Sequence, residues 1–204
     1  SLVEGRIDVS YSYPRNLVGA TALNALLERA ALQRMAQWVG DGRDVVDSGN
    51  GLGWAWTHAE TVDVMGAAAA YRSLLTSFFY YTGGAHPNSH SESLLVEVNG
   101  ADVLLLGLEE LFTTGSNWLE RVSTAVLAGL EQQGADAVTN GELSQLTATD
   151  LATFTLGPAG LSFHFDPYAV GPYVQGSFVV TVPYADLADL AAPGGALEAF
   201  AAEY

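Results

Sequence analysis

Hydrophobic and polar residues alternate in several stretches of this chain, and each such stretch predicts a half-buried β-strand. The first covers residues 3–13, where β-branched and aromatic residues occupy every second position. The second covers residues 54–64 and carries large side chains on its even positions, among them Trp56, His58 and Glu60. Further strands are predicted at residues 71–81, 94–99, 103–106, 154–156, 161–165 and 177–182.

Two other stretches have the spacing of amphipathic helices. Residues 20–39 carry an apolar stripe along one side, and the helix is predicted to end at Gly40. The second helix is predicted to begin at Asn117 as N-cap, with Glu120 three residues later as in a capping box, and to end at Gly134. Shorter helical turns are expected at residues 108–112, 142–146, 184–190 and 197–200.

Small and turn-forming residues predict the connections. The glycine-rich segment 47–53 is the best candidate for a mobile loop, and the small residues 66–70 are expected to form a turn between two strands. Asn99-Gly100 is a hairpin signal, and so is the segment 157–160.

The elements follow the order strand, helix, strands, helix, strands, which is segregated and unlike the alternation of parallel βαβ proteins. We therefore expect an α+β fold with a mainly antiparallel sheet, covered by two main helices and short C-terminal helices. Residues 1–70 are expected to form an N-terminal strand–helix–strand subdomain and residues 71–204 a second α+β domain. One core shared by both is the alternative.

The composition adds a strong negative charge to this picture. The chain has 204 residues, of which 49% are hydrophobic and 15% charged, and a mean hydropathy of +0.20, as is typical of a core-rich globular protein. It carries 23 acidic residues and seven arginines but no lysine, for a formal net charge of -16. Such a field repels nucleic acid and anionic membrane surfaces and attracts cationic partners. Solubility or halotolerance explains the acidity equally well.

The sequence contains no cysteine, which excludes disulfides, thiolate metal sites and cysteine nucleophiles. No apolar run approaches the ~18 residues that a membrane span requires, so we expect no transmembrane segment in this chain. No signal peptide is visible, although a processed chain would look the same. No cofactor is implied.

The densest group of unusual residues lies at positions 80–92, between two predicted strands. It contains paired tyrosines, Gly83 and Gly84, and two of the four histidines, His86 and His90. The glycines are expected to bend the backbone with positive φ angles, and His86 to donate a hydrogen bond to a backbone carbonyl. Because a proline separates the two histidines, they do not share a helix face as paired zinc ligands would.

A metal site is an alternative interpretation of the same residues. His86 and His90 could be joined by a carboxylate of Glu60, Asp63 or Glu92 from neighbouring strands. No Gly-x-Ser-x-Gly nucleophile elbow and no phosphate-binding loop accompany them. The residues therefore make no positive case for catalysis, and we expect the chain not to be an enzyme.

Two motifs together resemble a known family. The first is Tyr81-Thr82-Gly83-Gly84-Ala85-His86, and the second is Asp166-Pro167-Tyr168 followed by Gly171-Pro172-Tyr173. With the strands around them, they are similar to the extracytoplasmic domain family of the anti-sigma factor RsiV and of the N-terminal region of the peptidoglycan deacetylase PdaC, a domain of unknown function. The resemblance covers residues 71–187, and residues 3–39 resemble the smaller domain that usually precedes it.

This resemblance implies an extracytoplasmic protein of the periplasm, the cell surface or the secreted fraction, with a binding or sensing role at the cell envelope. In RsiV the ligand is lysozyme, a strongly basic protein, and an acidic chain suits such a ligand. The chain departs from the family pattern at Ala101, where a basic or polar residue is usual, and it shows no sigma-binding segment. A lipid anchor on the full-length protein is compatible with this expectation.

We therefore predict a non-enzymatic extracytoplasmic binding module whose ligand is a lysozyme-like protein or a cell-wall glycan such as a peptidoglycan fragment. The alternative is a metal-dependent cell-wall hydrolase, or an accessory domain of one, that uses His86 and His90. The predicted binding residues are Tyr81, Gly83, Gly84, His86, Asn88, His90, Tyr168 and Tyr173.

Four residues in or next to the second motif have simpler expected roles. His164 alternates with two phenylalanines and is expected to face solvent, and Asp166 is expected to bond its own backbone at a turn. The ring of Tyr173, like that of Tyr168, is either an exposed contact or packed at a sheet edge.

Overall fold

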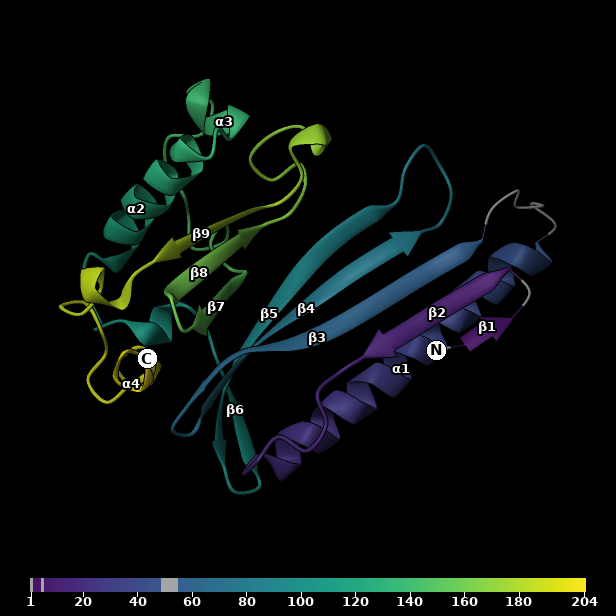
Figure 1. Ribbon diagram of the computed structural model, residues 1–204, viewed down its shortest axis with the longest axis horizontal. Coiled ribbons are helices and arrows are strands. Elements are labelled where there is room, and N and C mark those ends of the chain that lie inside the picture. Colours follow the sequence, from purple (N-terminus) through teal and green to yellow (C-terminus); the bar gives the residue numbers. More distant parts are fainter. Residues whose placement is uncertain (1, 5, 49–54) are drawn as a thin grey trace. The chain divides into compact units, whose positions relative to one another are not determined.

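The structure is a computed structural model that describes residues 2–4, 6–48 and 55–204. It confirms the predicted α+β fold, in which two β-sheets are accompanied by helices (Figure 1). The larger sheet has the strand order β1-β2-β3-β4-β5-β6, and the smaller sheet the order β7-β8-β9. The strands of the two sheets are β1 (Leu2–Glu4), β2 (Ile7–Ser12), β3 (Trp56–Ala68), β4 (Tyr71–Tyr81), β5 (Asn88–Asn99), β6 (Asp102–Leu106), β7 (Phe154–Gly157), β8 (Gly160–Phe165) and β9 (Phe178–Val182).

Backbone contacts divide the chain into two compact units that are interleaved along the sequence. Unit 1 comprises residues 1–63, 76–90 and 100–102, and unit 2 comprises residues 64–75, 91–99 and 103–204. The predicted division into residues 1–70 and 71–204 stays a prediction. None of the helices in the described part of the chain combines the length and the apolar character that a membrane span needs.

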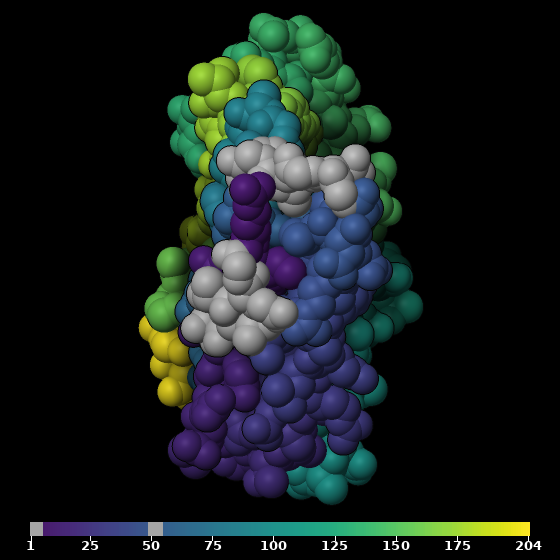
Figure 2. Space-filling model, turned by 90° about the vertical axis from the view of Figure 1, so that its right-hand side faces the viewer, coloured from purple at the N-terminus to yellow at the C-terminus, as the bar shows by residue number. Residues whose placement is uncertain are grey.

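Unit 1 is built around a parallel strand pair that the segregated element order did not predict. β2 and β3 run parallel, with Ile7 opposite Trp56 and Ser12 opposite Thr61. Parallel neighbours need a crossover connection, which here is the long helix α1 (Thr21–Asp47). The helix packs along β2 (Figure 1), and Figure 2 shows its surface, in purple to blue, beside the N-terminal strands.

The end of α1 differs from the prediction by several residues. Gly40 does not end the helix, which continues through Gly42 to Asp47. A Cβ atom on Gly42 would lie 2.7 Å from Cδ1 of Trp56, so this glycine permits a close contact with β3 and does not act as a helix stop. The contact belongs to the small core of unit 1, which contains Ile7, Val9, Val39 and Trp56.

Unit 2 contains the larger apolar core. The helix α2 (Trp118–Gln132) packs on β9, and Gly129 allows the close approach because it faces the side chain of Val180. Phe163 and Phe200 are both fully buried in this core. The remaining helical segments are η1 (Glu109–Leu111), α3 (Asp136–Thr139), η2 (Tyr173–Gln175), η3 (Tyr184–Asp186) and α4 (Ala196–Glu203).

Several predicted element boundaries were wrong. The first alternating stretch forms two antiparallel strands, β1 and β2, and the turn after β3 is confined to two alanines, the first of which, Ala69, has a φ of 46°. The strand β5 begins at Asn88, so the polar residues 88–93 extend a strand that was expected to start at 94. No helix forms at residues 142–146, and the expected helix at 184–190 is a single 3-10 turn.

Other boundaries were predicted correctly. The strand at residues 71–81 and the N-cap position of Asn117 are confirmed, but the Asn117 side chain makes no capping hydrogen bond. Most of the proposed mobile loop, positions 49–53, lies outside the described residues.

Candidate binding site

The loop between β4 and β5 has the geometry expected from its sequence. Gly83 and Gly84 have φ angles of 105° and 109°, in the region that favours glycine. The hydroxyl of Tyr81 donates to the carbonyl oxygen of Gly84 at 2.8 Å, and Nδ1 of His86 lies 2.8 Å from the carbonyl oxygen of Pro87. Because a carbonyl oxygen can only accept, Nδ1 carries the proton. His86 thus donates to a backbone carbonyl, as predicted, but the acceptor belongs to the next residue, and the bond across the glycine turn that His86 was expected to hold comes from Tyr81.

The other histidine of this loop is held by aromatic rings. His90 lies in β5, two residues after Asn88, and its ring stacks on Phe78 with centroids 4.1 Å apart and planes 5° apart. Tyr80 contacts the same ring edge-on at 5.9 Å. The described residues contain no group of three or more histidine or carboxylate side chains that could hold a metal. These contacts give the hydrolase hypothesis no support, and it stays untested.

A buried polar cluster in unit 1 was missed by the sequence analysis. His58 is fully buried, and its ring stacks on Trp38 at 4.1 Å. Its Nε2 atom lies 3.7 Å from Oε2 of Glu60, whose Oε1 accepts a hydrogen bond from Arg34 at 3.1 Å. Glu60 therefore pairs with Arg34, and its second carboxylate oxygen lies beside His58 without a hydrogen bond to it; Glu60 is not paired with His86 or His90. The signal was present, because positions 56, 58 and 60 alternate onto one face of β3.

The second motif forms a surface loop, residues 166–176, which we call the aromatic loop. Tyr168 is 62% exposed and has a φ of 75°, an unfavourable left-handed conformation for a bulky residue. The ring of Tyr173 lies 5.4 Å from that of Tyr168, and Val174 is 88% exposed. The loop thus presents Tyr168 and Val174 to solvent, with the half-buried Tyr173 beside them.

Contacts at its base hold the aromatic loop in this conformation. Val170 is buried in the core, and its carbonyl oxygen accepts a hydrogen bond from the amide of Ala137 at 3.0 Å. The side-chain amide of Gln175 donates to the carbonyl of Gly134 at 2.9 Å and to the carboxylate of Asp136 at 3.0 Å. A Cβ atom on Gly171 would clash with Oε1 of Gln175, so a larger residue would displace the Gln175 side chain from its hydrogen bonds.

A groove of about 590 Å³ lies beside the aromatic loop within unit 2. The carboxylates of Asp136 and Glu142 and the amide of Asn140 supply its polar wall. Tyr168 and Pro172 contribute the loop side of the same groove. The arrangement combines exposed aromatic surface with negative charge.

Unit 2 carries most of the negative charge of the chain. It contains 14 of the 23 acidic residues but only two of the seven arginines, Arg72 and Arg121, which gives it a formal charge of -12. Arg121 is paired with Asp189, and Arg72 donates to the backbone carbonyls of Ala69 and Tyr71. Unit 1 accounts for the remaining -4 of the total of -16.

Two expectations near the aromatic loop were wrong. The carboxylate of Asp166 accepts a hydrogen bond from the amide of Ser91 at 3.1 Å, so it fastens the loop to β5 instead of bonding its own turn. His164 is half-buried, and its Nε2 atom lies 2.9 Å from the hydroxyl of Thr155. Burial lowers the pKa of the His164 imidazole below its usual range, an effect that the nearby Asp166 carboxylate partly offsets.

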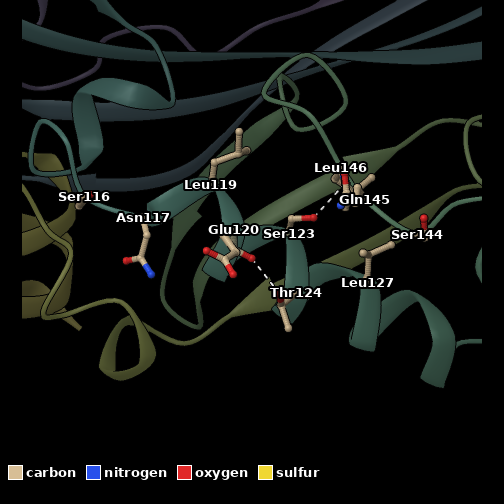
Figure 3. A pocket seen from close by; sticks show the side chains of 10 residues that line it. All are labelled: Ser116, Asn117, Leu119, Glu120, Ser123, Thr124, Leu127, Ser144, Gln145 and Leu146. Atoms are coloured by element: carbon tan, nitrogen blue, oxygen red, sulfur yellow. Dashed lines mark hydrogen bonds between the residues drawn. The ribbon is translucent and has the colours of Figure 1, made fainter.

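A second groove, of about 560 Å³, follows the outer side of α2 (Figure 3). Asn117 and Glu120 lie at its N-terminal end, and Leu127 lies further along the helix. The hydroxyl of Ser123 accepts a hydrogen bond from the amide of Leu146 at 2.9 Å, so this side chain joins the helix to the opposite wall. None of the predicted binding residues lines this groove.

The predicted binding residues fall into two groups that belong to different units. Tyr81, Gly83, Gly84, His86, Asn88 and His90 lie in unit 1, whereas Tyr168 and Tyr173 lie in unit 2. Of those in unit 1, Tyr81, Gly84 and His86 form hydrogen bonds within their own loop, and His90 packs against neighbouring rings. In unit 2 the exposed Tyr168, with the half-buried Tyr173 and the groove beside it, is the stronger candidate for ligand contact.

Comparisons with known proteins agree on a family but give no activity. Residues 109–185, which include the aromatic loop, match the family described as "Protein of unknown function (DUF3298)". Comparison with curated proteins gives no match. The structure is similar to that of a DUF3298 family protein from Pseudomonas aeruginosa PAO1, with a TM-score of 0.62 and 19% identity over 84% of this chain and 79% of the other.

A second solved structure supports the same fold. It is a member of the DUF3298 family from Bacteroides fragilis NCTC 9343, with a TM-score of 0.56 and 14% identity over 88% of this chain and 72% of the other. At these identities the likeness concerns the fold alone. The resemblance to RsiV and PdaC stays a prediction, and the chain carries in residues 109–185 a region that matches a domain family of unknown function.

Proposed function

We propose that this chain is a non-enzymatic, extracytoplasmic binding module that acts at the cell envelope, and that it binds a basic, lysozyme-like protein or a cell-wall glycan through the aromatic loop. The observation that carries the proposal is the exposed Tyr168, held at a positive φ next to a second tyrosine and an acidic groove. The compartment rests on the resemblance of the two sequence motifs to extracytoplasmic domains.

The backbone conformation of Tyr168 supports a binding role. A left-handed conformation costs a non-glycine residue about 1–2 kcal/mol, and such strain persists where the surrounding structure enforces it. Here the buried Val170 and the Gln175 hydrogen bonds enforce it. A loop held rigid before binding loses little entropy when a ligand arrives, and exposed tyrosines are frequent binding hot spots.

The charge distribution favours a cationic ligand. Two carboxylates line the groove, and unit 2 as a whole carries -12. Complementary charge accelerates encounter and excludes anionic competitors. A glycan remains in the proposal because tyrosine rings and carboxylates also suit sugar hydroxyls through stacking and hydrogen bonds.

The test is a calorimetric titration of the purified protein with lysozyme and, separately, with soluble muropeptides. We expect saturable binding of one of them, and a loss of affinity of tenfold or more in Tyr168→Asn, as for a hot-spot residue. Asparagine tolerates positive φ, so this variant removes the ring without disturbing the loop.

Tyr204→Ala is the matched control, because Tyr204 is 54% exposed in the same unit but lies outside the aromatic loop. It should bind like the unmodified protein. Absence of saturable binding to both ligands, or equal affinity in Tyr168→Asn and the unmodified protein, would overturn the proposal.

A further inference from the structure

The strand β6 is the edge of the larger sheet and has an unusual composition for an edge. It is the last strand in the order β1-β2-β3-β4-β5-β6, with β5 as its sheet neighbour. Leu104 is 57% exposed and Leu105 63% exposed. Successive residues of a strand point to opposite faces, so β6 presents apolar side chains on both faces.

Natural proteins protect such edges, and most of this one lacks the usual protection. Lysine, proline or an inward-pointing charge normally prevents another strand from pairing with an edge. β6 begins with the exposed Asp102, but residues 103–106 read Val-Leu-Leu-Leu, without charge or proline, and the whole chain has no lysine. Among the described strands none follows β6 in the strand order, so this edge can accept an additional strand beside residues 103–106.

An apolar groove opens beside this edge. It has a volume of about 560 Å³ and is lined by Leu95, Leu105 and Phe154 among other apolar residues. The exposed Glu109 and Glu110 also line it. All of these residues belong to unit 2. The edge thus lies beside a groove that can hold an apolar side chain and that is flanked by the carboxylates of Glu109 and Glu110.

We infer that β6 is a docking edge for an extended, basic peptide segment. The segment adds a strand beside residues 103–106 through main-chain hydrogen bonds, and it seats an apolar side chain in the groove. Its lysine or arginine side chains face Glu109 and Glu110. This surface is separate from the aromatic loop, so the inference does not depend on the proposed function.

The negative charge of unit 2 favours a basic segment over a second copy of this chain as the occupant of the β6 edge. If two copies of the chain paired through β6, two copies of unit 2 would meet, each with a formal charge of -12 and with Glu109 and Glu110 beside the edge. Like charges at an interface are unfavourable. A basic segment meets the same carboxylates with the opposite sign.

The experiment uses two fluorescent synthetic octapeptides, one alternating lysine with valine and the other alternating glutamate with valine. Fluorescence anisotropy measures their binding to the purified protein, and hydrogen exchange locates the bound strand. We expect saturable binding of the lysine peptide only, with slowed amide exchange at residues 103–106.

Two variants identify the surface. Leu105→Lys places a repelling charge on the edge and is expected to weaken binding at least tenfold. Because a single exposed ion pair contributes little, both carboxylates are replaced together. The double variant Glu109→Gln with Glu110→Gln should weaken binding roughly tenfold. Glu131→Gln, at an exposed acidic position of the same unit in α2, is the control for general charge and should change binding less than twofold. Unchanged unfolding midpoints confirm that the variants fold.

Three results would overturn the inference. The first is equal binding of both peptides. The second is binding of the lysine peptide that Leu105→Lys leaves unchanged or that slows exchange elsewhere. The third is a concentration-dependent dimer that Leu105→Lys dissociates, since this would make a second copy the occupant.

Discussion

The two compact units differ in how they bury their polar groups. In unit 2 the hydroxyl of Ser123 accepts a hydrogen bond from the amide of Leu146 at 2.9 Å, and the hydroxyl of Ser73 accepts one from the amide of Leu156 at 2.9 Å. In unit 1 neither ring nitrogen of His58 has a hydrogen-bond partner among the described residues, and Oε2 of Glu60 likewise has none there. In the described part of unit 2 the hydroxyl of Ser116 is the one buried polar side-chain atom in this state.

This difference indicates where the chain is stabilised. A buried polar group with a good partner fixes one arrangement of the core, whereas an unsatisfied one costs free energy. Unit 2 uses buried hydroxyls to hold loops and strands, and it also carries the larger apolar core. We therefore expect unit 1 to open at a lower free energy than unit 2.

The largest expected effect concerns the partnered hydroxyl of unit 2. Ser123→Ala leaves the buried amide of Leu146 without its acceptor, which costs about 1–3 kcal/mol of unfolding free energy. Denaturant unfolding followed by the fluorescence of Trp118, the one tryptophan of the unit 2 sequence, measures the loss. Thr124→Ala, whose hydroxyl donates to Glu120 in an exposed setting, should cost less than about 0.5 kcal/mol. Equal losses in both variants would contradict the role of burial.

The next effect tests packing in unit 1 with two glycines of one helix. Alanine in place of a helical glycine normally stabilises the folded protein by about 1 kcal/mol. Gly40 has open space where a Cβ atom would lie, so Gly40→Ala should be stabilising by this amount. Gly42→Ala instead forces a methyl group against Trp56, and overpacking of this kind costs about 1–3 kcal/mol.

We therefore expect unfolding free energies that shift in opposite directions for Gly40→Ala and Gly42→Ala. Tryptophan fluorescence of unit 1 is the measurement, because Trp56 itself lies at the contact. Stabilisation by both alanines would show that Trp56 moves aside without cost.

Local patterns were sufficient to predict much of the fold. The apolar, aromatic-rich segment gave the strand at residues 71–81 with its correct limits, and the doubled glycine gave the positive φ angles of the loop after it. Asn117 marked the start of α2 correctly. In each case the determinant lies within a few residues of the feature.

Contacts between distant residues could not be predicted in this way. Gly42 of α1 lies against Trp56, which is on another element, and Gly171 lies against Gln175. The polar start of β5 is a strand because neighbouring strands pair with it, not because its residues favour one. The same limit applied to the candidate site, where exposure distinguishes Tyr168 from the loop residues of unit 1.

A smaller effect is expected from the unsatisfied histidine of unit 1. His58→Phe keeps a planar ring on Trp38 and removes two buried nitrogens that form no hydrogen bond among the described residues, although Nε2 lies 3.7 Å from Oε2 of Glu60. Replacing such a group by an apolar one of similar shape is nearly neutral or stabilising, by up to about 1 kcal/mol. Denaturant unfolding measures the change, and a loss of more than about 1 kcal/mol would show that His58 has a polar partner in solution, such as a buried water.

The smallest effect concerns the pH dependence of unit 2. Burial lowers the pKa of His164, so the unfolded chain binds this proton more tightly than the folded chain. The stability from neutral His164 is complete above its ordinary pKa of 6.5 and is lost as the pH falls below that value toward the folded pKa. His164→Gln should reduce the change of unfolding free energy with pH in this range. Urea midpoints at several pH values on both sides of 6.5 measure it, and identical slopes for the variant and the unmodified protein would mean that His164 is protonated without opening unit 2.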